Sequence, residues 1–259
     1  MTTQVKRDIQ LVQFTDCHLQ AGPEQAYKGY FPEQRFDSVI AHIRHQSQQS
    51  DGFDHLIMSG DLAQFGASAV YQRLLEKTVG LAKNRHWLPG NHDDLSLMLH
   101  YDEMAEKVIK HGNWAIILLD STSDPDGVGS GAISEEQLQF LAKADQIDVS
   151  YLLLVLHHPP ITVNSRWQDE IKLSNSDDFW QVISALKKVK GISFGHLHQE
   201  QHIVRDDIEL FCTPATTYQY KAEQDEVVVE DDDELAKAGY RLFSLHPDGV
   251  ISTQVVRVS

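Results

Sequence analysis

The sequence predicts an α/β fold, and three observations carry this prediction. Short, nearly continuous apolar runs recur along the chain, at residues 8–16, 53–61, 86–93, 113–121, 149–160 and 191–200. Helical patterns lie between these runs, and such alternation is typical of a sheet whose strands are covered on both faces. After Asp207 the pattern changes to strands and turns, which indicates a mixed sheet completed by the C-terminal part.

The individual elements follow from spacing and from residues typical of helix ends and turns. The stretch 31–46 has apolar residues at helical spacing, namely Phe36, Val39, Ile40 and Ile43. The stretch 134–144 opens with Ser134, a residue type that caps helices, and continues with Leu138 and Leu141. Near the C-terminus, Pro247-Asp248-Gly249 separates two strand patterns and predicts a hairpin.

Length and charge limit the classes of function. The chain has 259 residues, enough for one large α/β domain, and we expect residues 1–259 to form a single domain. Its formal net charge of −16 argues against polymeric nucleic acid or an anionic membrane as the main partner. A small anionic substrate remains compatible with this charge if bound metal ions supply positive charge locally. Oligomeric state cannot be inferred from these features.

Cysteine usage and hydropathy favour a cytoplasmic protein. Cys17 and Cys212 form neither a disulfide framework nor a paired zinc-ribbon motif, so a reducing compartment is the simpler expectation. No run approaches the roughly 18 apolar residues of a membrane span.

An acidic segment stands apart from the rest, at residues 221–239. Runs of like charge are usually solvated, so a solvated loop or an exposed helix start is the simplest interpretation. The alternative is a lid near the site or an interaction segment.

The stretch Trp87-Leu88-Pro89-Gly90-Asn91-His92-Asp93 places an amide, an imidazole and a carboxylate directly after a Pro-Gly break. Taken alone, it fits a turn followed by a helix N-cap, because Asn and Asp favour both and the chain after Asp94 has a helical pattern. The other strand ends decide between this interpretation and a functional one.

Polar residues follow the expected strands at five places. They are Asp16 with His18, Asp61, Asn91 with His92, His157 with His158, and His196 with His198. Ligands of open α/β sheets bind outside the carboxyl ends of the strands, so we expect these clusters to converge on one crevice.

The residue types in these clusters predict a metal centre. Alternate residues of an extended segment point to one face, so Asp-x-His and His-x-His can each direct two ligands at one ion. Carboxylate, amide and imidazole ligands suit manganese, iron and zinc. Seven candidate ligands exceed the needs of one tetrahedral ion. They suit two ions about 3.5–4 Å apart that share a carboxylate.

The ordered set of motifs resembles the calcineurin-like metallophosphoesterases. The set is Asp16-x-His18, Gly60-Asp61, Gly90-Asn91-His92-Asp93, His157 and Gly195-His196-Leu197-His198. The stretches around these motifs are similar to the bacterial class III 3′,5′-cyclic AMP phosphodiesterases. The resemblance implies a four-layer αββα sandwich of two mixed sheets, with a dinuclear metal site at the carboxyl ends of the strands.

The resemblance also implies roles for individual residues. Asp16, His18 and His198 would hold one ion, Asn91, His157 and His196 the other, and Asp61 would bridge both. His157 is chosen over His158 because it holds the family's His-x-Pro position. The substrate would be bound by His18, Asp61, Asn91, His92 and His198. His92 would contact the phosphate and serve as a general acid, and Asp93 would orient His92 or cap the next helix.

The expected reaction is metal-dependent hydrolysis of 3′,5′-cyclic AMP to 5′-AMP by a metal-bridging hydroxide, with iron or manganese as the expected ions and zinc as an alternative. Two other interpretations stay open: action on another small phosphodiester, such as a glycerophosphodiester or a 2′,3′-cyclic nucleotide, and a metal-stabilised regulatory protein without turnover. Residues 213–217 and 161–175 are expected to line the pocket. Base selectivity, the native metal and the role of residues 221–239 cannot be inferred from the sequence.

Overall fold

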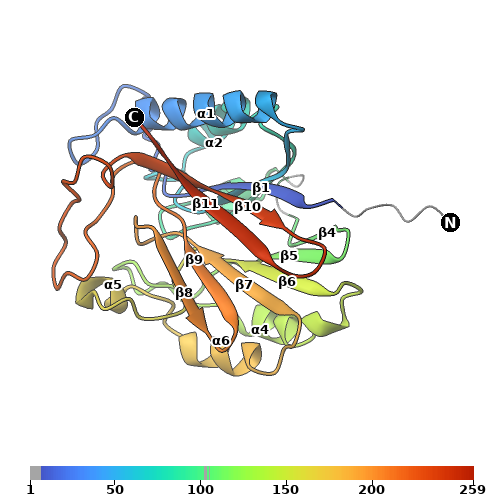
Figure 1. The fold of residues 1–259 in the computed structure, drawn as a ribbon. Coiled ribbons are helices and arrows are strands. Elements are labelled where there is room, and N and C mark those ends of the chain that lie inside the picture. Colours follow the sequence, from blue (N-terminus) through green and yellow to red (C-terminus); the bar gives the residue numbers. More distant parts are fainter. Residues whose placement is uncertain (1–6, 102–103, 105) are drawn as a thin grey trace.

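Two β-sheets form the centre of the molecule (Figure 1). The computed structural model describes residues 7–101, 104 and 106–259. The first sheet has five strands in the order β11-β10-β1-β2-β3, and the second has six in the order β4-β5-β6-β7-β9-β8. Both are mixed: β1–β2–β3 and β5–β6–β7–β9 pair in parallel, whereas β10, β11, β4 and β8 join as antiparallel strands.

The strands of the first sheet are β1 (Ile9–Phe14), β2 (Phe53–Ser59), β3 (Ala82–Leu88), β10 (Ala238–Leu245) and β11 (Ile251–Val258). Those of the second are β4 (Val108–His111), β5 (Trp114–Leu118), β6 (Tyr151–Val155), β7 (Val189–Phe194), β8 (Gln201–Arg205) and β9 (Ile208–Cys212).

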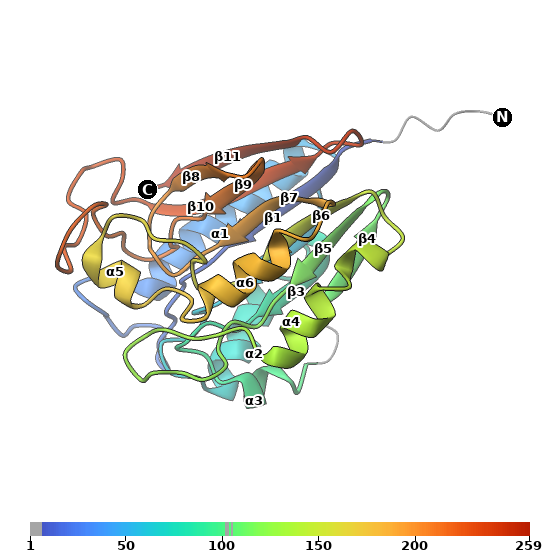
Figure 2. The same ribbon diagram turned by 90° about the horizontal axis from the view of Figure 1, so that it is seen from below.

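Helices cover the outer face of each sheet. Those on the first sheet are α1 (Pro32–Gln49), α2 (Ser68–Lys77) and α3 (Leu95–Met98). The second sheet is accompanied by α4 (Glu135–Leu141), α5 (Arg166–Glu170) and α6 (Ser176–Ile183), with a 3₁₀ turn at Ala144–Gln146. In Figure 2, α4 and α6 cross the face of the second sheet that is turned towards the viewer.

Three layers of buried apolar side chains hold these elements together. One joins the first sheet to its helices and includes Phe14 and Phe36. Another joins the second sheet to α4 and α6. The third lies between the sheets and includes Leu11 and Trp114. Because each sheet buries both faces, the expected four-layer αββα sandwich is confirmed.

Most expected elements appear with small shifts at their ends. The helix expected at 31–46 is α1, and Ser134 caps α4 by accepting a hydrogen bond from the Gln137 amide. The predicted hairpin joins β10 to β11, where Leu245 pairs with Ile251. The sequence did not single out α2, α5, α6, β4 or β8; of these, β4 and β8 are the edge strands of the second sheet.

The segment after Asp94 corrects one expectation. Its helical pattern yields only the four residues of α3, and the capping residue is Asp94, whose side chain accepts from the Leu97 amide. Asp93 therefore does not cap this helix. Among the described residues, no helix has the length and hydropathy of a membrane span.

Candidate metal centre

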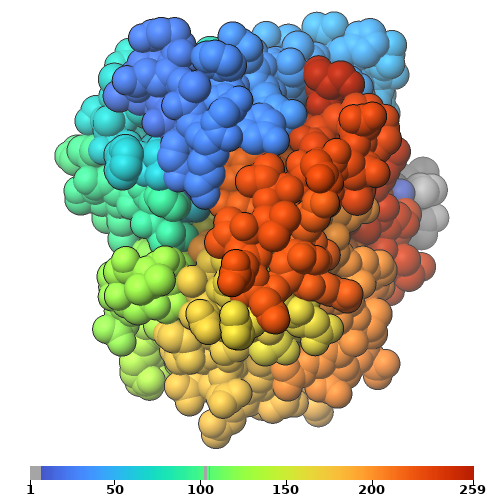
Figure 3. All heavy atoms as spheres, turned by 90° about the vertical axis from the view of Figure 1, so that its left-hand side faces the viewer, coloured from blue at the N-terminus to red at the C-terminus, as the bar shows by residue number. Residues whose placement is uncertain are grey.

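The predicted site residues all follow strands at one edge of the two sheets. Asp16 lies two residues beyond the end of β1, and Asp61 lies two beyond β2. His157 and His196 lie two residues beyond β6 and β7, and Asn91 lies three beyond β3. This edge corresponds to the left-hand side of Figure 1, where β1 ends, and it faces the viewer in Figure 3.

Asp16, His18 and His198 form the first of two compact groups. One potential ligand atom from each lies within 4.8 Å of the others, and all three side chains are buried. The Nε2 atoms of His18 and His198 are 3.0 Å apart, and His198 Nε2 is 3.4 Å from Asp16 Oδ1.

Asp61, His157 and His196 form the second group under the same distance limit. His157 Nε2 lies 3.4 Å from Asp61 Oδ1 and 3.2 Å from His196 Nδ1. The other oxygen of Asp61, Oδ2, lies 3.7 Å from His18 Nε2. Asp61 therefore presents one carboxylate oxygen to each group.

Asn91 is positioned by the backbone on either side of it. The amide of His92 donates to Asp61 Oδ1 at 3.0 Å. A Cβ atom on Gly90 would lie 2.2 Å from the same oxygen, so only glycine allows this approach. Asn91 is thus held beside Asp61, as the Pro-Gly break in the sequence suggested.

Hydrogen bonds behind the histidines fix the direction of their lone pairs. The Nδ1 atoms of His18, His157 and His198 lie 2.9, 2.9 and 2.7 Å from Gln64 Oε1, the Ser59 carbonyl and the Tyr218 carbonyl, respectively. Because oxygen accepts in each pair, Nδ1 carries a proton and Nε2 faces the centre. Such outer hydrogen bonds are characteristic of metal-binding histidines.

Unpartnered polar atoms test whether metal ions fit here. Buried side-chain atoms without a hydrogen-bond partner include Asp16 Oδ1, Asn91 Oδ1 and His196 Nε2. Orphaned buried polar atoms are costly, and three of the eight found among the described residues belong to predicted ligands, where a metal ion would satisfy them. The donor set of carboxylate, amide and imidazole atoms fits borderline or hard divalent ions.

The electrostatics of the cluster also favour cations. Burial lowers the pKa of His18 to about 3, so its imidazole is neutral, the form that binds metal. Burial also acts to lower the pKa of His157, but the charges of Asp61 and Asp16 outweigh this effect and raise it to about 9. The buried carboxylates thus stabilise a positive charge within the cluster.

The backbone at these residues is strained. Asp16, His18, Asp61, His196 and His198 all have positive φ values, between 45° and 69°. Non-glycine residues rarely adopt this region, and it costs on the order of 1–3 kcal/mol each. Five of the eleven described non-glycine residues with positive φ are predicted ligands, so the fold tolerates strain where it turns these side chains inward.

His92 lies at the border of the centre. It is half-buried, and its ring can approach His18 and Asp61 within the same 4.8 Å limit. Its Nδ1 lies 3.1 Å from Gln64 Nε2 and 3.2 Å from the Gln64 carbonyl, so Gln64 occupies this nitrogen. Nε2 is then the nitrogen left for exchange of a proton with a bound molecule.

Two neighbouring residues have structural contacts. Asp93 accepts hydrogen bonds from the amides of Leu62, Ala63 and Gly90 and from the Tyr71 hydroxyl. The described contacts of Asp93 do not include the His92 ring, so the expectation that it orients His92 was wrong. His158 contacts Ser121 Oγ and the Gly129 carbonyl through its two ring nitrogens.

Residues that the sequence did not reveal surround the centre. Gln64 reaches both His18 Nδ1 and His92 Nδ1 through its side chain. The ring of Tyr218 lies 4.6 Å from that of His198. Lys28 Nζ donates to Tyr220 Oη at 2.5 Å and lies 5.0 Å from the centre of the Tyr218 ring.

The two segments expected to line the pocket lie against the centre. Thr217 Oγ1 donates to the Asp16 carbonyl, and the Thr216 amide donates to the Thr15 carbonyl. Residues 213–217 therefore hold the backbone that carries Asp16. From residues 161–175, Gln168 donates to the Leu197 carbonyl between the two histidines of the His-x-His motif.

The acidic segment is largely exposed, and it ends earlier than expected, because Ala238 and Gly239 already belong to β10. It contains no helix. It is fastened by an ion pair between Lys221 and Asp231 and by the Gln224 amide, which donates to Ser165 Oγ. Figure 3 shows it, in orange-red, beside the blue N-terminal segment on the face that carries the centre.

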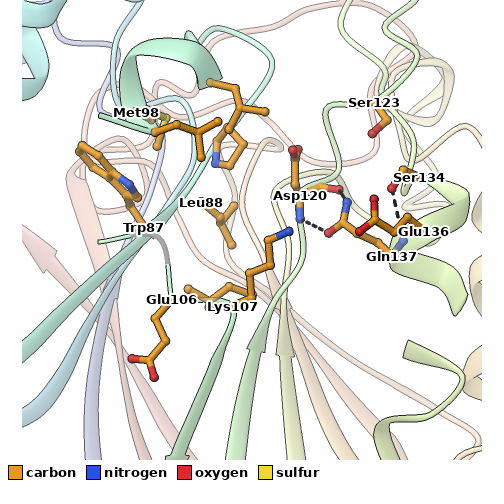
Figure 4. A pocket seen from close by; sticks show the side chains of 14 residues that line it. Trp87, Leu88, Met98, Glu106, Lys107, Asp120, Ser123, Ser134, Glu136 and Gln137 are labelled. Carbon is orange, nitrogen blue, oxygen red and sulfur yellow. Dashed lines mark hydrogen bonds between the residues drawn. The ribbon is translucent and has the colours of Figure 1, made fainter. Parts of the chain in front are cut away.

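A separate cavity of about 260 Å³ lies between the edges of the two sheets (Figure 4). Trp87, Leu88 and Met98 line one side, and Asp120 and Gln137 line the other. Its lining contains none of the predicted metal ligands.

Comparison with known proteins agrees with this geometry. Residues 9–200 match the family described as calcineurin-like phosphoesterase. The chain belongs to this family. The match includes every predicted metal ligand.

Relatives and solved structures extend this assignment. The chain is 34% identical to the 3′,5′-cyclic adenosine monophosphate phosphodiesterase CpdA of Vibrio vulnificus, covering 98% of this chain and 92% of the relative. It is 33% identical to CpdA of Escherichia coli K12, covering 97% and 90%. A dimetal phosphatase from Danio rerio shares the fold, with a TM-score of 0.69 at 12% identity over 98% of this chain and all of the other.

Proposed function

We propose that this chain is a metal-dependent phosphodiesterase that hydrolyses 3′,5′-cyclic AMP to 5′-AMP. The observation that carries the proposal is the pair of bare Nε2 atoms on His18 and His198, 3.0 Å apart with their protons on the opposite side of each ring. Two facing lone pairs repel each other unless a cation lies between them. The relatives named as cyclic AMP phosphodiesterases suggest the substrate.

In this proposal, Asp16, His18 and His198 hold one ion, and Asn91, His157 and His196 hold the other. Asp61 is shared, because its two oxygens face the two groups. Iron or manganese is the proposed metal, with zinc as the alternative. When bound, two such ions activate water at neutral pH and neutralise charge on the phosphoryl oxygens.

The protein side chains then act on the substrate. The cyclic phosphate lies beside His18, Asp61, Asn91, His92 and His198. Water oxygen would form a bond to phosphorus as the bond between phosphorus and the 3′ oxygen breaks, and His92 would protonate the departing 3′ oxygen through Nε2. Gln64 holds the other nitrogen of His92 and so keeps the ring turned to the substrate.

We further propose that residues 1–259 act as one catalytic domain in the cytoplasm, with residues 221–239 as a loop or lid beside the site. A small cyclic nucleotide suits this acidic chain better than a polymer, whose many phosphates would be repelled by the net charge of −16.

The proposal is tested by initial rates of 3′,5′-cyclic AMP hydrolysis with manganese-loaded and chelator-stripped protein. We expect metal-dependent formation of 5′-AMP and a clear preference over 2′,3′-cyclic AMP measured in parallel. Hydrolysis of 2′,3′-cyclic AMP or a glycerophosphodiester alone would leave the metal centre in place and exclude the proposed substrate. Metal binding without hydrolysis of any phosphoester would favour a regulatory protein.

A further inference from the structure

We propose that an open hollow beside the metal centre binds the adenine base of the substrate, with Phe65 as its stacking surface. The hollow measures about 540 Å³ and lies between residues 20–26 and 65–67. This volume is within the range of small-molecule sites, about 300–1,000 Å³. The inference rests on the proposed function, because it assumes that a nucleotide phosphate lies at the metal centre.

The two walls of the hollow begin at the metal centre. Gln20 and Ala21 lie two and three residues after His18, and Phe65 lies four residues after Asp61. Backbone hydrogen bonds join the two segments close to the metal centre. The Leu19 amide donates to the Leu62 carbonyl, and the Gln64 amide donates to the Leu19 carbonyl. A molecule bound by its phosphate at His18 and Asp61 can therefore extend into this hollow.

Phe65 is exposed, and the residues on both sides of it, Gln64 and Gly66, are held in place by other contacts. Its side chain is 76% exposed, the second most exposed of the large apolar side chains described. Gln64 is buried and bonded to His18 and His92. At Gly66, a Cβ atom would lie 2.2 Å from the Cβ of Asp94, so the backbone there is also packed tightly. The ring is thus a fixed apolar surface in water, which suits stacking of a nucleobase.

Two carboxamides in the same hollow can recognise the edge of adenine. Gln20 donates to the His18 carbonyl through Nε2, which leaves Oε1 as an acceptor. Gln25 accepts from the Gly22 amide through Oε1, which leaves its NH₂ group as a donor. Adenine presents the complementary pair, a donor at N6 and an acceptor at N7, whereas guanine presents two acceptors on that edge. Gln20 Oε1 and the NH₂ group of Gln25 can therefore pair with N6 and N7 of adenine.

The wall that carries Gln20 is held in place from outside. Arg73 Nη2 donates to the Gln20 carbonyl at 2.6 Å, and its Nε donates to the carboxylate of Glu33. This wall needs no large rearrangement to receive a base, and preorganisation of this kind lowers the cost of binding.

The test replaces Phe65 by Ala, Leu and Tyr, with Phe140→Ala as the matched control. Phe140 is also exposed, at 40%, but it lies on α4, away from the hollow. We expect Phe65→Ala and Phe65→Leu to raise KM for 3′,5′-cyclic AMP about tenfold with little change in kcat, because aromatic stacking contributes a factor of that order. Phe65→Tyr and Phe140→Ala should retain the original KM.

Methyl p-nitrophenyl phosphate, which carries no nucleobase, separates base binding from damage to the centre. Its hydrolysis should be unchanged in the Phe65 variants. Inhibition of this reaction by 5′-AMP and by ribose 5-phosphate tests the hollow whether or not cyclic AMP is hydrolysed. Wild type should bind 5′-AMP more tightly than ribose 5-phosphate. In Phe65→Ala the two inhibitors should bind with equal affinity. An unchanged difference in Phe65→Ala, or an equal loss for the base-free ester, would overturn the inference and leave the proposed function standing.

Discussion

Among the described residues we compare two groups of largely buried histidines, one of which has the geometry of a metal centre. The second group comprises His55 on β2, His86 on β3 and His111 on β4. His55 Nδ1 lies 3.1 Å from His86 Nε2, and His55 Nε2 lies 2.9 Å from His111 Nδ1. The three imidazoles therefore form a chain with His55 in the middle, and its two ring nitrogens each contact another imidazole.

The two groups differ in backbone position and in neighbouring carboxylates. His55, His86 and His111 lie within strands and have ordinary backbone angles, whereas the predicted ligands follow strand ends and often have positive φ. The second group lacks a shared buried carboxylate among its described ion pairs; the acid recorded there is Glu106, which is 56% exposed and 3.7 Å from His86. Burial of histidine alone therefore does not define a metal site.

The largest expected effect is at the carboxylate shared by the two groups. Asp61→Asn should lower the phosphodiesterase rate on the order of 10⁴-fold or more, because both ions depend on it and metal is needed to make hydroxide available near pH 7. Metal analysis should show loss of bound ions. The matched change in the second group, His86→Gln, should leave metal content and rate unchanged; a similar loss in that variant would abolish the distinction between the groups.

His92 should affect turnover without affecting the metals. We expect His92→Ala to lower kcat by about 10²–10⁴-fold, the usual contribution of a general acid, while metal content stays at the wild-type value. Steady-state kinetics combined with metal analysis measures both quantities. Wild-type kcat in this variant would remove His92 from the mechanism.

A smaller loss is expected from the partner that connects His18 to His92. Gln64→Leu should lower metal affinity or activity by about 10- to 100-fold, the range typical of hydrogen bonds behind metal ligands. Gln72→Leu, on the exposed face of α2, is the matched control because its described bond is only to Glu76. Equal activities for the two variants would contradict the orienting role of Gln64.

The smallest expected effect concerns the second group and is a change in how protein stability depends on pH. Burial lowers the pKa values of His55 and His86 to about 4, below the ordinary value of 6.5. Between these pH values the unfolded chain binds more protons, so the free energy of unfolding should fall as pH drops from about 6.5 to about 4.

Urea unfolding at pH 7 and pH 5 measures this dependence. His86→Gln should reduce the difference between the two pH values, whereas His45→Gln, on the exposed surface of α1, should not. Because the metal-centre histidines are the same in all three proteins, their contribution cancels in the comparison. A difference as large in His86→Gln as in wild type would show that the second group does not titrate in this range.

The strand-end clusters were predictable because the signal is local. An apolar run followed at once by Asp, Asn or His places the polar side chain at the end of a buried strand, and parallel strands bring such ends together. Asp16, Asp61 and His157 were all placed in this way. The layered fold was predictable from the same runs.

Contacts between distant segments were not predictable from the sequence. Gln64 bonds His18 after β1 and His92 after β3, and a lone Gln three residues beyond Asp61 carries no local sign of this. Asp93 shows the opposite error: its place beside His92 suggested a joint role, but the fold turns it towards the Leu62 and Ala63 amides. Such directions depend on loop conformation rather than on spacing.

The most direct test of the central claim is a manganese titration of chelator-stripped protein, with formation of 5′-AMP from 3′,5′-cyclic AMP as the readout. The account predicts that the rate rises until two equivalents of metal are bound per chain and then stays constant, and that His86→Gln gives the same curve. Full activity without metal, saturation at one equivalent, or metal binding with no 5′-AMP formed would contradict it.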